Sequence, residues 1–130
     1  MLNIGDAAKA SGVSAKMIRH YESIGLIDAA RRTEAGYRLY SEQEVQVLQF
    51  IHRGRELGFT LEQIATLLAL WKNEGRASKD VRAMAQQHID ELDKKIGAMQ
   101  AMRRTLAQLA SACHGDDRPD CPILDDLAPH

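Results

Sequence analysis

The chain contains two cysteines, Cys113 and Cys121, which lie in a polar segment near the C-terminal end. A loop of this length can bring two sulfur atoms to one metal ion. Thiolates select Cu(I) and its congeners, whereas structural Zn²⁺ usually takes four nitrogen or sulfur ligands. A pair of thiolates with no third cysteine predicts a linear site for Cu(I), with Ag(I) or Au(I) as alternatives. His114 is a candidate third ligand, and two plain reduced thiols are the other interpretation.

Charge is distributed unevenly along the chain, although the formal net charge is only −1. The stretch from Lys16 to Arg38 contains five cations and three anions, whereas the stretch from Ser111 to His130 contains five aspartates and one arginine. An asymmetry of sign indicates that the two ends perform different tasks, and a cationic segment is suited to a nucleic acid.

Two short helices are predicted around the first of these cations. One covers Asp6–Ala10, with Gly5 as its cap and Gly12 closing it. Ser14 caps the next, over residues 14–24, whose apolar residues recur at helical spacing. Two helices joined by a short turn are typical of a helix-turn-helix motif.

A small β-hairpin is predicted over residues 26–40, around a turn at Gly36, and would form a wing beside the helix-turn-helix. The helix over 14–24 would lie in the major groove, where Arg19 can pair in bidentate fashion with guanine. Wing residues would contact the phosphate backbone, which positions the protein rather than specifying sequence. The candidate contacts are Lys16, Arg19 and Tyr21 on the helix, and Arg32, Tyr37 and Arg38 on the wing.

Capping signals predict two further helices. Ser41 and Glu44 form the pattern of a capping box at the start of a third helix. Thr60 and Gln63 repeat that pattern at the start of a helix over residues 61–71.

A long helix is predicted from Ser78 to about Ala110, because the stretch has no proline and carries apolar residues in steps of three and four. It would be about 50 Å long. A chain of this length has no second long helix to pack against the apolar stripe. We therefore expect the helix to pair with that of a second copy, antiparallel or parallel, and hence a homodimer. A short helix is predicted over 123–127.

The predicted fold is mainly α: a winged helix-turn-helix domain with connecting helices over residues 1–72, a long antiparallel coiled-coil dimerisation helix over 78–110, and a metal-binding loop with a short terminal helix over 111–130. Apolar runs are shorter than the roughly 20 residues that span a bilayer, and the first residues lack the features of a signal peptide. A cytoplasmic location is therefore expected. Paired catalytic groups and phosphate-binding loops do not occur, so an enzyme is not predicted.

The sequence resembles the mercury-resistance regulator (MerR) family over essentially its whole length. The resemblance lies in Ile4–Ala8, Ser14–Glu22, Gly25–Ile27, Arg32–Tyr40 and Leu57–Leu61. It implies a dimer on a palindromic promoter whose −35 and −10 elements are too widely spaced, a metal-dependent distortion of the DNA, and engagement of RNA polymerase. It also implies that Arg55 contacts phosphate.

The C-terminal segment resembles the copper-responsive branch of that family, which has a Cys-x₇-Cys loop followed by Pro-Ile. That branch carries a serine at the start of the dimerisation helix, matched here by Ser78, where divalent-ion sensors have a third cysteine. Two thiolates and Cu(I) leave one negative charge, which the helix end at Ser78 and the cation Arg82 would offset. We expect that helix end to come from the other subunit.

Copper export and detoxification genes are the implied targets of such an activator. A divalent-ion sensor of the same family is one alternative. A cytosolic copper-storage or chaperone protein that uses the cysteine loop without DNA is another, and it would not need residues 14–40.

Overall fold

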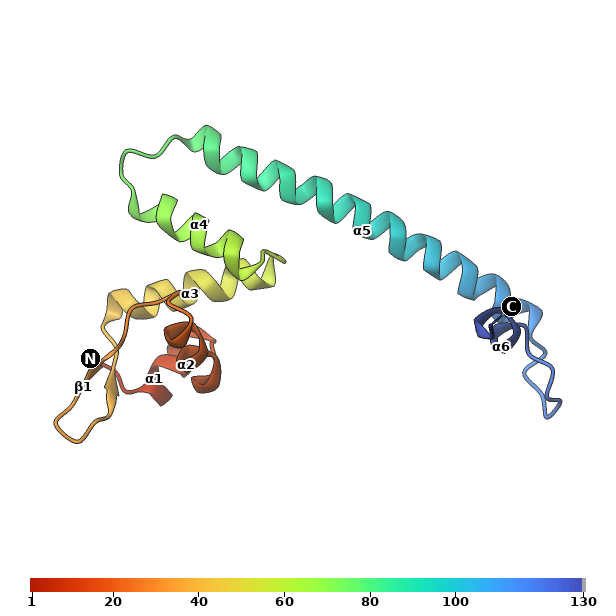
Figure 1. Cartoon of the computed structure of the whole chain (residues 1–130), viewed down its shortest axis with the longest axis horizontal. Coiled ribbons are helices and arrows are strands. Elements are labelled where there is room, and N and C mark those ends of the chain that lie inside the picture. Colours follow the sequence, from red (N-terminus) through yellow and green to blue (C-terminus); the bar gives the residue numbers. More distant parts are fainter. Residues whose placement is uncertain (130) are drawn as a thin grey trace. The chain divides into compact units, whose positions relative to one another are not determined.

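The computed structural model describes residues 1–129, and the chain divides into two compact units, Met1–Val81 and the remainder from Arg82 (Figure 1). The first unit holds four helices and a two-stranded hairpin. The second holds most of the longest helix, a loop and a short helix. The expected class, a winged helix-turn-helix followed by a long helix, is confirmed.

Local capping explains the first two helices, α1 (Ile4–Ser11) and α2 (Ala15–Ser23). Helix α1 begins two residues earlier than expected, because the side chain of Asn3, and not Gly5, caps it by accepting the backbone N–H of Asp6 at 2.8 Å. Gly12 ends α1 with a φ of 79°, in the left-handed region that favours glycine. As expected, the hydroxyl of Ser14 caps α2.

The wing consists of β1 (Arg31–Arg32) and β2 (Arg38–Leu39), which pair antiparallel. Gly36 supplies the positive φ of the turn, at 87°. Beyond the predicted hairpin, Leu2 and Tyr40 exchange two backbone hydrogen bonds of 2.8 Å. The N-terminal residues are thereby attached to the base of the wing.

Helices α3 (Glu42–Glu56) and α4 (Leu61–Lys72) begin at the predicted caps. Thr60 and Gln63 form the complete capping box. The Ser41 box is only half as predicted: the Ser41 hydroxyl accepts the N–H of Glu44 at 3.1 Å, but it also donates to the Glu44 carboxylate at 3.0 Å. The Glu44 carboxylate therefore accepts a hydrogen bond from the hydroxyl of Ser41. In a complete capping box it would accept one from the backbone N–H of Ser41.

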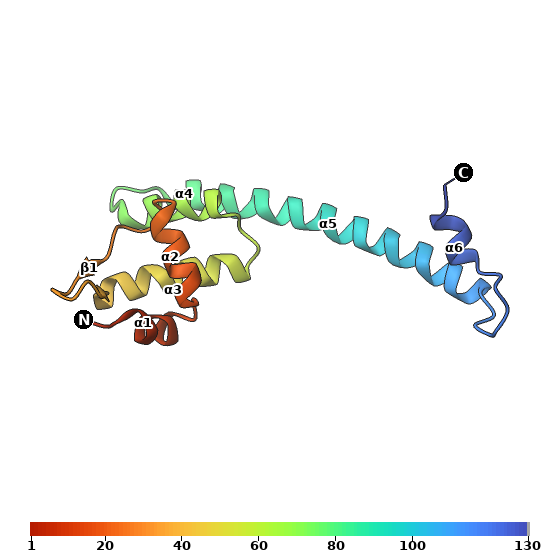
Figure 2. The ribbon, with the colours of Figure 1, turned by 60° about the horizontal axis from the view of Figure 1, so that its bottom comes forward.

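The core of the first unit lies where α3 packs against α1 and α4, while α1 also packs against α2 (Figures 1 and 2). Its largest fully buried side chains come from α2, the end of the wing, α3 and α4, and are Ile18, Tyr40, Leu48, Ile51 and Ile64. Gly54 on α3 permits the close approach of α4, because a Cβ there would lie 2.9 Å from Cγ1 of Ile64.

The second unit contains the length of α5 (Ser78–Ala112) beyond Val81, followed by a loop and α6 (Pro122–Leu127). Helix α6 begins one residue before the predicted start, with Pro122 at its first position. Proline is tolerated there because a backbone N–H in the first turn makes no hydrogen bond within the helix. No helix within residues 1–129 is both long and apolar enough to cross a membrane.

Candidate functional site

The ends of two helices bring the cysteines together. Cys113 directly follows the last residue of α5, and its backbone N–H still bonds the carbonyl of Leu109 at 3.1 Å. Cys121 directly precedes α6. The two sulfur atoms lie 3.7 Å apart, and both side chains are half-buried. Residues eight positions apart thus form one sulfur pair, close enough for both to approach a single ion.

The start of α6 acts on the thiol of Cys121. The backbone N–H of Leu124 has the largest effect in lowering the pKa of Cys121, and the N–H of Ile123 and the thiol of Cys113 lower it further. Desolvation and the carboxylate of Asp125 oppose that effect. The net lowering favours the thiolate, which is the form that binds metal.

The loop between the cysteines is organised by its own polar residues. Asp116 accepts the backbone N–H of Arg118 and pairs with its guanidinium, both at 2.9 Å. Gly115 takes a positive φ of 64°. Within residues 1–129 no three His, Cys, Asp or Glu side chains cluster as metal ligands would. His114 is exposed, and the candidate site in the described chain is therefore the sulfur pair.

The predicted charge partners of the metal lie at the other end of α5. Ser78 is its first residue and Arg82 follows one turn later, and both are exposed. Ser78 and Cys113 are thus separated along one helix of 35 residues, which corresponds to about 50 Å. Ser78 and the sulfur pair therefore belong to opposite ends of one helix.

Helix α2 presents Lys16 and Arg19, both of which are exposed. The expectation that Tyr21 projects from this helix is wrong, because its side chain is only 5% exposed and belongs to the core. Tyr21 follows Ile18 by three positions and so shares its inward face. Helix α2 therefore offers two cations rather than two cations and an aromatic ring.

The wing presents its three predicted residues differently. Tyr37 is 72% exposed, and Arg32 is exposed while donating to the carbonyl of Gly36 at 2.9 Å. Arg38 is half-buried, and its Nε lies 3.0 Å from a carboxylate oxygen of Glu22 on α2. The guanidinium of Arg38 is therefore held by α2 as well as by the wing.

Glu22 is a residue that the sequence interpretation counted only as an anion. Its second carboxylate oxygen accepts the backbone N–H of Ala30 at 3.4 Å, so the side chain bonds the wing on both sides. The available signal was that Glu22 and Arg38 carry opposite charges and lie in two of the motifs of the resemblance, Ser14–Glu22 and Arg32–Tyr40. Arg55, the remaining predicted contact, is exposed and donates to the carbonyl of Phe59 at the junction between α3 and α4.

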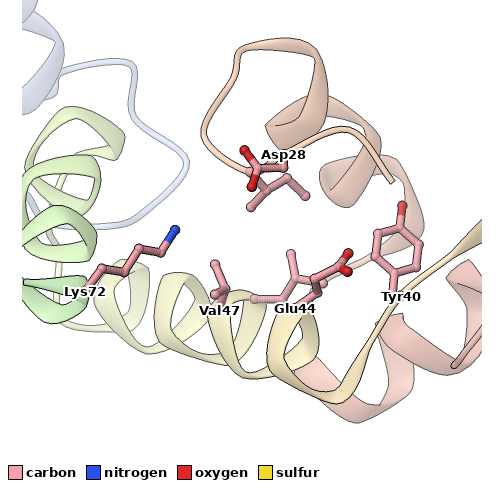
Figure 3. Close-up of a pocket in the computed structure, with 7 residues that line it drawn as sticks. Asp28, Tyr40, Glu44, Val47 and Lys72 are labelled. Atoms are coloured by element: carbon pink, nitrogen blue, oxygen red, sulfur yellow. The ribbon is translucent and has the colours of Figure 1, made fainter. Parts of the chain in front are cut away.

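A small cavity of about 50 Å³ lies between the Asp28 loop, α3 and the end of α4 (Figure 3). Tyr40, Glu44, Val47 and Lys72 line it together with Asp28. Burial raises the pKa of Tyr40, and the nearby carboxylates of Glu22 and Glu44 raise it further. The cavity is far below the roughly 300–1,000 Å³ of small-molecule sites, so it suits water rather than a ligand.

The fold and these surfaces define a class: a winged helix-turn-helix regulator of transcription. Residues 2–71 match the family "MerR HTH family regulatory protein", and residues 45–109 match "MerR, DNA binding". The chain belongs to the MerR family of transcription regulators.

Relatives match over nearly the whole chain. It is 59% identical over 127 residues to "Heavy metal-dependent transcription regulator 2" of Rhizobium meliloti, covering 98% of this chain and 86% of that protein. It is 39% identical over 127 residues to the HTH-type transcriptional regulator CueR of Escherichia coli O157:H7, covering 98% and 94%. Among solved structures, PbrR691 from Ralstonia metallidurans CH34 in complex with lead(II) aligns with a TM-score of 0.81 and 34% identity, covering 98% of this chain and 100% of that one.

Proposed function

We propose that this chain is a cytoplasmic, metal-responsive activator of transcription that binds a palindromic promoter as a homodimer. In the proposal, residues 1–72 bind DNA, 78–110 form the dimerisation helix, and 111–130 bind the metal. The inducer is Cu(I), with Ag(I) and Au(I) as chemically equivalent ions. The regulated genes would remove or detoxify copper.

The observation that carries the metal assignment is the pair of sulfur atoms 3.7 Å apart, at the junction of α5 and α6. Two thiolates suit a soft ion that accepts two ligands. The lowered pKa of Cys121 reduces competition from protons. The names of the heavy-metal-dependent relatives and the similarity to CueR agree with this assignment.

The partner subunit would complete the surroundings of the metal. Two thiolates and one monovalent ion leave a net negative charge, and the N-terminus of a helix stabilises such a charge. Ser78 is the first residue of α5, and Cys113 follows its last residue. An antiparallel pair of α5 helices would therefore bring Ser78 and Arg82 of one subunit near the cysteines of the other. Metal binding would then favour one shape of the bound DNA over another, which RNA polymerase could engage.

A divalent ion is the second candidate inducer. The observation in its favour is the similarity to PbrR691, whose structure contains lead(II). A divalent ion would leave a two-thiolate site neutral and would require further ligands, for which His114, the neighbour of Cys113 in the sequence, is a candidate. A storage or chaperone role without DNA is the weaker alternative, because the family match covers the helix-turn-helix.

X-ray absorption of the dimer loaded with Cu(I) tests the proposed coordination. We expect two sulfur ligands and no nitrogen or oxygen ligand. Three or four ligands, or no uptake of Cu(I), would contradict the proposal. Transcription from the chain's own promoter in vitro, with Cu(I), Ag(I), Zn²⁺ and Pb²⁺ added separately, would then show whether the monovalent or the divalent candidate is correct.

A further inference from the structure

We propose that Glu22 is a positioning residue for DNA binding: it fixes the wing against α2 and so sets where Arg38 and its neighbours meet the DNA. This inference rests on the proposed DNA-binding role of α2 and the wing. It assigns a function to an anion that lies among the cations of the candidate interface.

The geometry of the Glu22 carboxylate supports this role. One oxygen lies 3.0 Å from Nε of Arg38, and the other accepts the backbone N–H of Ala30 at 3.4 Å. The side chains of Glu22 and Arg38 are 13% and 26% exposed. An ion pair so shielded from water is stronger and better defined than the usual surface pair.

The two partners of Glu22 lie on the two sides of the hairpin. Ala30 directly precedes β1, and Arg38 begins β2. A hairpin with only two paired positions has little stability of its own, so its orientation depends on the attachments at its base. Glu22 is the attachment from α2, and the bridge between Leu2 and Tyr40 is the attachment from the N-terminus.

Electrostatics alone would disfavour a carboxylate at this place. DNA repels an anion, and removal of a negative charge near a DNA-binding surface should strengthen binding through the phosphate backbone. The positioning role predicts the opposite, because a released wing no longer holds its phosphate contacts in register. The sign of the effect therefore separates the two explanations.

The test compares Glu22→Gln with Glu34→Gln in the full-length protein. Glu34 is exposed in the turn of the wing, so its substitution removes the same charge. The probe is a duplex that the unmodified chain selects from a random-sequence pool, with a scrambled duplex for non-specific binding. We expect Glu22→Gln to weaken specific binding on the order of tenfold and to lower its salt dependence, while Glu34→Gln binds equally or more tightly.

Two further variants distinguish positioning from a general loss of structure. In an Arg38→Ala background, Glu22→Gln should have little additional effect, since its main partner is already absent. Glu22→Asp keeps the charge but is too short to reach both partners, so it should weaken binding partially. All measurements are made at a temperature where circular dichroism shows each variant folded, and hydroxyl-radical footprints should lose protection at the sites contacted by the wing.

Specific binding by Glu22→Gln that equals or exceeds that of the unmodified chain would overturn the inference. The inference would also be overturned if Glu22→Gln reduced specific binding by the same factor in the unmodified chain and in the Arg38→Ala background. If the unmodified chain selects no sequence from the pool, the proposed DNA-binding function itself fails, and the inference fails with it.

Discussion

Each cysteine is expected to be necessary for the metal response and dispensable for DNA binding, because the sulfur pair lies in the second unit while the proposed DNA-binding residues lie in the first. Cys113→Ser or Cys121→Ser should abolish induction by Cu(I) in a promoter assay and leave promoter affinity within about twofold. Ser111→Ala, a neighbouring exposed position, is the control. Loss of promoter binding in either cysteine variant would contradict this division of labour.

The carboxylate of Asp125 is expected to raise the lower pH limit of metal binding by a small amount. It raises the pKa of Cys121, so Asp125→Asn should lower that pKa further. Because protons compete with the metal for the thiolate, uptake of Ag(I) should then persist to lower pH than in the unmodified chain. Thiolate absorbance against pH, with Asp126→Asn as the matched control, checks the shift. A pKa that rises in Asp125→Asn would refute the assigned cause.

Residue types and spacing are enough to predict the candidate metal ligands, because two cysteines in one short loop have few other arrangements. They are not enough to predict the state of Arg38. Its partner Glu22 is 16 positions away, and only the folded wing brings the two together. Tyr21 shows the same limit: its type suits an interface, but burial depends on which face of α2 meets the core.

At the scale of elements, three helix starts were predictable because one side chain bonds a backbone N–H a few residues later, whereas the equivalent cap of α1 by Asn3 was missed because Gly5 was chosen instead. Ser14, Ser41 and Thr60 all cap as expected, since these bonds depend only on local sequence. The bridge between Leu2 and Tyr40 was not predicted, because it joins residues far apart in the sequence without a turn signal between them.

The contact between α3 and α4 leads to a prediction on stability. Alanine at Gly54 would place a Cβ 2.9 Å from Cγ1 of Ile64, which is fully buried, so one of the two helices or the Ile64 side chain must shift. Overpacking costs about 1–3 kcal/mol, and the gain in helix propensity is about 1 kcal/mol, so Gly54→Ala should lower the free energy of unfolding by about 1 kcal/mol.

Gly97→Ala is the matched control for that substitution. Gly97 also lies within a helix, but apart from its chain neighbours and the backbone of its own helix no atom of the described chain would lie within 4 Å of its new Cβ. Gly97→Ala should therefore stabilise the protein by about 0.5–1 kcal/mol. Urea unfolding of both variants provides the measurement, and stabilisation by Gly54→Ala would show that the two helices separate more easily than the structure indicates.

At the scale of the whole molecule, the exposed apolar face of α5 requires a partner. Ile96, Met99, Met102 and Leu106 are each more than half exposed in the single chain, and they recur in steps of three and four. Proteins that function as monomers rarely expose so continuous an apolar surface. A second copy of α5 would cover it, and two DNA-binding units would then meet the two halves of a palindrome.

If the proposed dimer forms through this face, Leu106→Glu should dissociate it. In a symmetric interface each substitution acts twice, and loss of a buried leucine costs about 2 kcal/mol per site, so the dissociation constant should rise roughly a thousandfold. Gln108→Glu adds the same charge on another face of α5 and should leave the dimer intact. Sedimentation equilibrium distinguishes the two, and promoter affinity should fall only in Leu106→Glu, because a monomer contacts one half-site. If Leu106→Glu remains a dimer, this face is not the dimer interface, and Ser78 cannot reach the partner's cysteines in the proposed way.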